Sequence, residues 1–366
     1  MITAPKNFAV NTVLVFTIVL VLGEVITRFF ITSTNIVVQD PDIGWIYKAN
    51  QTIFHTKEGW GENTINNYGF NDRNYPTTRY THRIVVLGDS YTEAFHIGRD
   101  KNFTTLIENY LPCADVQNIG RSGLSPVHYP ALSKKMLTTF PQKTDLQVIV
   151  LTPGDYKELQ STDAKISFEE STGEVTNIKL KEYKPHWLRE KTALIFENSA
   201  LATFIKERVR LLSKSKTPPK ETNKPLTKNN KQTSPEPTDK TKNILKYVFS
   251  EVRSQSPLLL VYIPRIFYYP NNQYVHAKYS YEFENLIREV ATDLNIPFIS
   301  TYNELGNSYQ RNQQPPVGFA NYNISKGHLN ERGHTAVANA ILQKIDQTCI
   351  TPTLTAMESD TRMIRP

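Results

Sequence analysis

The sequence predicts an α/β fold, in which helices cover both faces of a parallel β-sheet. From Arg83 onward, short apolar segments alternate with amphipathic helical patterns, which is typical of such a sheet. The segment "LQVIVLT", 146–152, is apolar almost throughout, as strands buried on both faces are. The alternation stops near residue 160 and resumes after residue 242. We therefore expect one three-layer α/β/α domain over 81–350, with a five-stranded parallel sheet and an insertion at 160–242.

The elements of this domain follow from their periodicity. In "NFTTLIENYL" the apolar residues recur on one helical face, and the final helix has Asn330 in place to cap it. Strands are expected at 83–87, 115–120, 146–152, 257–264 and 296–300. Helices are expected at 102–111, 130–139, 243–254, 279–294 and 331–345.

Other parts of the chain lack this alternation. The lead-in, 32–80, is punctuated by Pro, Gly and Asn and predicts no regular structure. Within the insertion we expect a hairpin that turns at Gly173 and a helix at 192–212, followed by a loop at 213–242. A polar tail, 351–366, ends the chain.

The charge of the chain is concentrated in that loop. The 366 residues are 39% apolar and carry a formal net charge of +7. Ser213 to Lys242 contains eight Lys against three acidic residues, with almost no apolar side chain to bury. This composition is typical of a disordered surface loop. We therefore expect no nucleic-acid binding, although a weak attraction to acidic glycan or lipid is compatible with the charge.

An apolar segment near the N-terminus predicts export. After a short tail, 1–7, Phe8 to Ile31 is nearly all apolar until Glu24 and Arg28. At about 1.5 Å per residue, it is long enough to cross roughly 30 Å of hydrocarbon. We interpret 8–31 as a single transmembrane anchor, with the rest of the chain on the periplasmic or extracellular side. The competing interpretation is a cleaved signal peptide, since Lys6 gives it a basic start.

Ser90 is the first candidate for chemistry. It follows the first strand in "VVLGDSYTEA", at the edge of the sheet where ligands collect in open α/β folds. Alternatively, Ser90 only caps the turn. A nucleophile needs a base and oxyanion donors. His328, in "SKGHLNERGH", follows the last strand and is expected at the same edge. His334 falls inside the last helix, where a packed or surface histidine is the usual outcome.

Four motifs together resemble the SGNH/GDSL hydrolase family in its membrane-anchored bacterial form: "GDSYTEA", "NIGRSG", "TPGD" and "GHLNERGH". The resemblance implies a flavodoxin-like SGNH hydrolase fold. It also implies that Ser90 is the nucleophile and an oxyanion donor, that Gly123 is a second donor, and that His328 is the base.

Two positions depart from the family pattern. The third block lacks the family's oxyanion Asn, so Gly154 or Asp155 takes its place. Lys326 and Ser325 stand where the family has an Asp before the histidine. Because Asp155 follows the third strand, which neighbours the first in this winding, we expect it to be the carboxylate at the rim of the site.

These observations predict a serine ester hydrolase or O-acyltransferase that acts on acyl groups of envelope glycan or lipid. The alternative, motivated by the two departures, is a catalytically impaired relative that serves as a glycan-binding or assembly subunit. We expect no metal and no organic cofactor, since neither metal-ligand spacing nor a glycine-rich dinucleotide motif is present. The oligomeric state is left open.

The chain has two cysteines, Cys113 and Cys349. Each follows the end of a predicted helix, the first and the last of the domain. In a doubly wound sheet these two helices usually cover the same face and run in the same direction, so their C-terminal ends are neighbours. Because an exported domain meets an oxidising compartment, we expect a Cys113–Cys349 disulfide.

Overall fold

The computed structural model describes residues 6–27, 37–75, 82–139, 143–160, 164–180, 199–202, 204–205 and 238–345. The chain forms two compact units. One comprises Met1–Ile36, Thr52–Phe54 and Lys184–Lys231, and the other comprises Val37–Gln51, His55–Tyr183 and Gln232–Pro366. The second unit contains the predicted sheet.

A five-stranded parallel sheet lies at the centre of this unit, as predicted. Its strand order is β13-β10-β7-β5-β6, and every pairing is parallel. The third strand along the chain, β7, lies beside the first, β5, as the winding requires. The strands are β5 (His82–Leu87), β6 (Ala114–Asn118), β7 (Leu146–Leu151), β10 (Leu258–Tyr262) and β13 (Phe298–Ser300).

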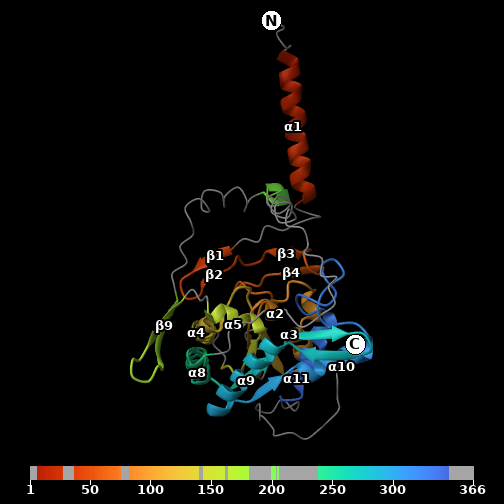
Figure 1. Cartoon of the computed structure of the whole chain (residues 1–366). Helices are drawn as coiled ribbons and strands as arrows, with labels where there is room; N and C mark the ends of the chain where they lie inside the picture. The colour runs from red at the N-terminus through yellow and green to blue at the C-terminus, as the bar shows by residue number, and fades with distance from the viewer. Residues whose placement is uncertain are drawn as a thin grey trace. The chain divides into compact units, whose positions relative to one another are not determined.

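Helices cover both faces of the sheet, so the unit has three layers (Figure 1). Alternate residues of β5 face opposite sides: Val85 and Leu87 belong to one core cluster, Ile84 and Val86 to the other. The first face carries α4 (Tyr129–Thr139), α5 (Pro153–Gln160), α8 (Asp239–Arg253) and α9 (Lys278–Asp293). The second carries α3 (Phe103–Tyr110), α10 (Tyr302–Asn312) and α11 (Glu331–Leu342).

Helix ends follow the expected chemistry. The side chain of Asn330 caps α11, accepting hydrogen bonds from the backbone N–H groups of Arg332 and Gly333 at 3.1 and 3.3 Å. Helix α8 begins at Asp239, where Thr238 caps it, so the predicted end of the loop at residue 242 is too late.

The lead-in differs from the expectation of irregular structure. It forms four short strands: β1 (Val37–Asp40), β2 (Gly44–Tyr47), β3 (Thr52–His55) and β4 (Gly61–Thr64). Strands β1 and β2 pair as an antiparallel hairpin. These strands are too short and too polar to show the alternation by which strands are identified in a sequence.

Two further hairpins form two-stranded sheets separate from the central sheet. Strands β8 (Ala164–Phe168) and β9 (Val175–Leu180) pair in antiparallel register, and Gly173 lies in their turn at φ +69°. This is the hairpin expected in the insertion; β9 is yellow-green in Figure 1. The sequence did not predict a second hairpin, β11 (Ile266–Tyr269) with β12 (Gln273–His276), which follows β10.

The N-terminal apolar segment forms a helix, α1 (Lys6–Ile26). Within the same compact unit, the carboxylate of Glu24 accepts hydrogen bonds from the Ser199 hydroxyl and from the backbone N–H groups of Ala200 and Leu201, at 2.8 to 3.0 Å. None of the helices in the described part of the chain has the length and apolarity that a membrane crossing demands. The expected transmembrane anchor at 8–31 is therefore not supported.

Several expectations fall on residues outside the described ranges. These are most of the helix at 192–212, the loop at 213–237, the tail at 351–366 and Cys349. Cys113 lies after α3, and α3 packs against α11 on the second face of the sheet, as expected. No cysteine in the described part of the chain is free. The pairing of Cys113 with Cys349 stays a prediction.

Candidate active site

Ser90 is the first residue of a short helix, α2 (Ser90–Glu93), that begins three residues after β5 ends. The cap of this helix is Asp89, whose carboxylate accepts a hydrogen bond from the Tyr91 N–H at 2.8 Å. Ser90 therefore does not act as the cap. Its hydroxyl is directed elsewhere, and its own N–H lies at the start of the helix, where no intrahelical acceptor exists.

The Ser90 hydroxyl contacts His328. Ser90 Oγ and His328 Nε2 are 2.9 Å apart, although 238 residues separate them in the sequence. A second contact holds the loop of His328 against α2, since the Tyr91 hydroxyl donates to the Gly327 carbonyl at 2.8 Å. Ser90 and His328, the two residues that the motifs predicted to share a site, therefore lie in contact.

The carboxylate bonded to His328 is Glu58. Its Oε2 lies 2.9 Å from His328 Nδ1, and its Oε1 accepts the backbone N–H of His328 at 2.5 Å. Because a carboxylate only accepts, Nδ1 carries the hydrogen, and Nε2 is left to accept from Ser90 Oγ. Ser90, His328 and Glu58 therefore form a hydrogen-bonded chain with the geometry of a serine triad.

The surroundings keep Glu58 ionised. Burial acts to raise its pKa, but the hydrogen bonds and charge of His328 outweigh burial and leave the pKa below its usual value. Glu58 is 8% exposed. An ionised acceptor in this position fixes the ring orientation of His328.

Loop-to-loop hydrogen bonds hold Glu58 in place. The amide of Asn321 accepts from the Gly59 N–H at 2.8 Å and donates to the carbonyls of Gly59 and Thr56 at 2.9 and 3.1 Å. Gly327 lies at φ +100°, and a Cβ there would be 1.9 Å from Glu58 Oε1. Only glycine therefore lets the two loops approach this closely.

Asp155, the expected carboxylate, lies elsewhere. It is fully buried and accepts the Thr152 N–H at 2.6 Å. The Thr152 hydroxyl also joins it to Asp89, donating to Asp89 Oδ2 at 3.0 Å and lying 3.3 Å from Asp155 Oδ2. Burial, and then the charge of Asp89, raise the pKa of Asp155. The expectation that Asp155 serves the site was wrong in position, because Glu58 occupies the place beside His328.

The two glycines expected as oxyanion donors differ. Gly123 is exposed at φ +80°, with open space where a Cβ would stand. Its N–H has no hydrogen-bond partner among the described residues. By contrast, the Gly154 N–H already donates to Thr152 Oγ1 at 3.2 Å. The Gly123 N–H is therefore available to a ligand oxygen, whereas the Gly154 N–H is engaged within its own turn.

Two other histidines, His334 and His96, are buried and have structural contacts. His334 is 1% exposed, its Nδ1 accepts the Phe103 N–H at 3.3 Å, and burial lowers its pKa to about 3. It is a packed helix residue, as expected. His96 stacks on the ring of His328 with centroids 3.7 Å apart, and burial, followed by the charge of His328, lowers its pKa. His96 therefore stays neutral beside the candidate base.

One group in the described part of the chain could hold a metal ion. Glu58, His96 and His328 each offer a ligand atom, and these atoms lie within 4.8 Å of one another. Glu58 and His328 already use those atoms in their mutual hydrogen bond, so a bound metal would displace the proton that orients His328. The expectation that the site works without a metal stays a prediction.

Glu58 was not predicted, because a carboxylate was expected either just before His328 or, as with Asp155, directly after a strand. Glu58 lies 270 positions earlier, in a segment without regular periodicity. The one local signal is the pair of glycines that follows it in "KEGWG". A Cβ at Gly59 would lie 2.1 Å from the His96 carbonyl, and one at Gly61 would lie 2.0 Å from that of Phe95. Such close backbone approach indicates a segment packed into the domain.

Comparison of the chain with protein-family models and with curated proteins gives no match. Among solved structures, a member of the lipolytic G-D-S-L family from Veillonella parvula is similar at 14% identity and a TM-score of 0.38, covering 72% of this chain and 97% of its own. An acetylxylan esterase from Geobacillus stearothermophilus is similar at 13% identity and a TM-score of 0.39, covering 73% and 95%. These scores are low, so the likeness has no bearing on the activity of this chain.

Proposed function

We propose that this protein is a serine ester hydrolase or O-acyltransferase in which Ser90 is the nucleophile, His328 the general base and Glu58 the residue that orients His328. The observation that carries the proposal is the unbroken chain of hydrogen bonds from Ser90 Oγ through His328 to Glu58, with links of 2.9 Å on either side of the ring. Both distances lie within the range for proton transfer.

The proposed reaction uses these groups in two half-reactions. Ser90 Oγ attacks the ester carbonyl carbon while its proton passes to His328 Nε2, and the carbonyl oxygen becomes an oxyanion that the N–H groups of Ser90 and Gly123 face. The carbon–oxygen bond to the leaving alcohol then breaks, and His328 returns the proton to that alcohol. Water or a sugar hydroxyl repeats the sequence in reverse and releases Ser90.

The alternative is a catalytically impaired binding or assembly subunit. Of the two departures from the family pattern that favoured it, one no longer does so. The missing acid before His328 is replaced in space by Glu58. The missing third-block Asn remains a departure, and loss of one oxyanion donor costs on the order of 10² to 10³ in rate. We therefore propose a competent enzyme with a reduced oxyanion hole.

A fluorophosphonate probe tests the proposal directly. We expect wild-type protein to be labelled at Ser90 and to hydrolyse p-nitrophenyl acetate, and Ser90→Ala to lose both. Ser125→Ala is the matched control, since Ser125 follows a different strand and lies beside His128 rather than His328. Folded wild-type protein that takes up no probe at Ser90 would favour the binding subunit.

We also propose export to an oxidising compartment, where the substrate would be an acylated envelope glycan or lipid. The proposal is supported by Cys113, which is not a free thiol in the described part of the chain. Mass spectrometry of unreduced peptides should find Cys113 linked to Cys349. Two alkylatable thiols in protein from an oxidising compartment would contradict the pairing.

A further inference from the structure

Glu93, the last residue of α2, carries a buried carboxyl group that the proposed reaction does not use. Glu93 is 1% exposed. Its Oε1 accepts the backbone N–H of Ser122 at 3.0 Å, and its Oε2 bonds to the Ser122 hydroxyl. Because Ser122 comes directly before Gly123, the carboxyl group of Glu93 is joined at two points to the turn that supplies the second oxyanion donor.

The direction of the Gly123 N–H depends on Ser122. This N–H belongs to the planar peptide unit between the two residues, so it turns only with the backbone dihedrals on either side. Gly123 lies at φ +80° with open space where a Cβ would stand, so no neighbour restrains it on that side. The two bonds from Ser122 to one carboxyl group therefore restrict the direction of the Gly123 N–H.

The turn also lies against the residues on either side of the nucleophile. The Arg121 N–H donates to the carbonyl of Gly88, two residues before Ser90, at 3.1 Å. A Cβ at Gly120 would lie 2.5 Å from the backbone nitrogen of Glu93, three residues after Ser90. The turn therefore runs alongside the segment that carries the nucleophile.

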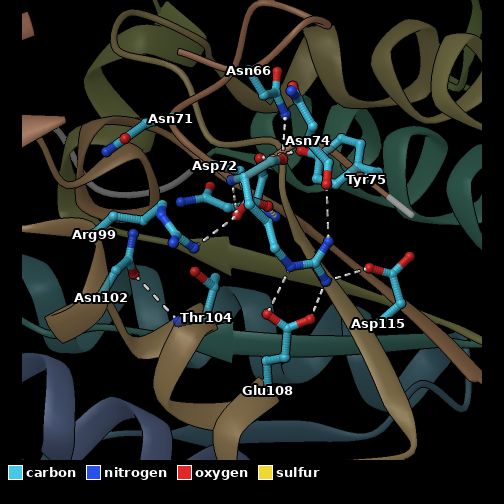
Figure 2. Close-up of polar contacts among 12 residues, drawn as sticks. Asn66, Asn71, Asp72, Asn74, Tyr75, Arg99, Asn102, Thr104, Glu108 and Asp115 are labelled. Carbon is cyan, nitrogen blue, oxygen red and sulfur yellow. Dashed lines mark hydrogen bonds and ion pairs between the residues drawn. The ribbon is translucent and has the colours of Figure 1, made fainter. Parts of the chain in front are cut away.

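Asparagine side chains fix the end of α2. The Asn71 amide donates to the Glu93 carbonyl at 2.7 Å, and the Asn102 amide donates to the Thr92 carbonyl at 3.0 Å. Figure 2 shows both asparagines, and a dashed line joins Asn102 to Thr104, whose N–H it accepts. The carbonyls at the end of a helix have no intrahelical donor, and these amides supply one. The carboxyl group of Glu93 is therefore attached to a fixed backbone.

The surroundings of Glu93 disfavour its negative charge. Burial raises its pKa to about 7, against the opposing effects of hydrogen bonds to Ser122 and Tyr47 and of the charge of Arg121. Below that pH the carboxyl group is mostly neutral. A protonated carboxyl group still bonds to Ser122, because its carbonyl oxygen accepts the N–H and its O–H donates to the hydroxyl. In this form it does not repel the charge that develops on an oxyanion.

We infer that Glu93 is a positioning residue for the oxyanion hole: its carboxyl group holds the Ser122–Gly123 peptide beside α2, so that the N–H groups of Gly123 and Ser90 face one oxyanion. The inference rests on the proposed function, because it assigns Glu93 a task in that reaction. It also bears on the missing third-block Asn, since with fewer donors the direction of each N–H matters more to the rate.

Kinetics per reactive serine separate positioning from folding. Full-length wild type, Glu93→Ala and Glu93→Gln are each labelled to completion with the fluorophosphonate probe, which counts the molecules with a reactive Ser90. We expect Glu93→Ala to lower kcat per labelled serine for p-nitrophenyl acetate by roughly 10- to 100-fold and to leave KM unchanged, because only a transition-state interaction is lost. Glu93→Gln keeps an acceptor and a donor for Ser122 and should retain most of the wild-type kcat.

Ser122→Ala provides a second variant in case Glu93→Ala does not fold. It removes only the hydroxyl bond, from a half-buried side chain. It should lower kcat per labelled serine by a smaller factor, again with KM unchanged. Wild-type kcat in Ser122→Ala would then count against the inference.

Amide hydrogen exchange measures the turn without turnover. A peptide covering residues 119–125 should exchange faster in Glu93→Ala than in wild type, because the Ser122 N–H loses its acceptor. The matched control is Glu284→Ala, which removes a buried carboxylate of α9 that pairs with Arg288. It should lower stability but leave both the exchange at 119–125 and kcat per labelled serine unchanged.

Three kinetic results would overturn the inference: wild-type kcat per labelled serine in Glu93→Ala, a raised KM with unchanged kcat, or a Glu93→Gln variant as impaired as Glu93→Ala. If wild-type protein takes up no probe and hydrolyses no ester, the proposed function fails and exchange alone decides. Faster exchange at 119–125 in Glu93→Ala would then support the positioning of the turn, and unchanged exchange would refute it.

Discussion

Ser90 and Glu58 bond to the same histidine from regions that are built in different ways. Ser90 follows a central strand of a parallel sheet, and its position is fixed by the buried residues of β5 on both faces. Glu58 lies in a turn of the lead-in. Its position is fixed by its own hydrogen bonds to His328 and by those of its neighbours Thr56 and Gly59 to Asn321. The comparison shows that one site can combine a serine positioned by core packing with a carboxylate positioned by polar contacts between loops.

Removing the carboxylate of Glu58 should lower kcat more than any other change considered below. We expect Glu58→Gln to lower kcat for p-nitrophenyl acetate on the order of 10² to 10⁴, because an amide no longer fixes the protonation of His328. The matched control is Glu331→Gln, an exposed carboxylate of α11 that pairs with Lys101. Equal rates in Glu58→Gln and wild type would remove Glu58 from the relay.

Displacing the carboxylate of Glu58 without removing it should lower kcat by less. A methyl group at Gly327 would collide with Glu58 Oε1 and would require a strained backbone at φ +100°. We expect Gly327→Ala to lower kcat by roughly 10², the usual cost of misplacing a catalytic group by about 1 Å. Gly173→Ala carries a similar strain in a distant turn and should lower stability without lowering kcat.

Loosening the contact between the loops should act on rate and stability together. Asn321→Ala removes three hydrogen bonds to the segment of Glu58. We expect about a tenfold lower kcat and a loss of roughly 1 to 3 kcal/mol in the free energy of unfolding. Unchanged kinetics together with normal folding would mean that Glu58 is held by His328 alone.

The pH dependence of the free energy of unfolding should differ between the region of Ser90, represented by Glu93, and the region of Glu58. On α2, burial raises the pKa of Glu93 to about 7, whereas that of Glu58 is lowered. Between the ordinary glutamate pKa and 7, the unfolded chain releases the Glu93 proton but the folded chain keeps it, so stability falls as pH rises, by up to roughly 3 kcal/mol. Glu58 acts in the opposite direction: its contribution is present above its unfolded pKa and is lost as pH falls through the lowered folded value.

Urea unfolding at pH 5 and pH 8 measures the contribution of Glu93, since Glu58 titrates below this interval. We expect Glu93→Gln, which keeps the contacts with Ser122 but cannot ionise, to lose less stability over that interval than wild type does. An identical loss in both proteins would show that Glu93 titrates normally.

The sheet and the serine–histidine pair could be predicted from the sequence because their signals are local. The apolar strand 83–87 ends one residue before Gly-Asp-Ser, and His328 lies between the last strand and a helix with a recognisable cap. Parallel winding then places both at one edge of the sheet. Glu58 could not be predicted in this way, because polar contacts between distant loops leave no periodic pattern. Asp155 gave a misleading signal, since its position after β7 leads into the interior rather than to the rim.

The 270 residues between Glu58 and His328 have a consequence for the order in which the protein is made. A ribosome finishes Glu58 and Ser90 long before it reaches His328. Every nascent chain that ends before residue 328 therefore holds a serine that nothing activates. The hydrogen-bonded chain of Ser90, His328 and Glu58 can therefore form only after residue 328 has been made.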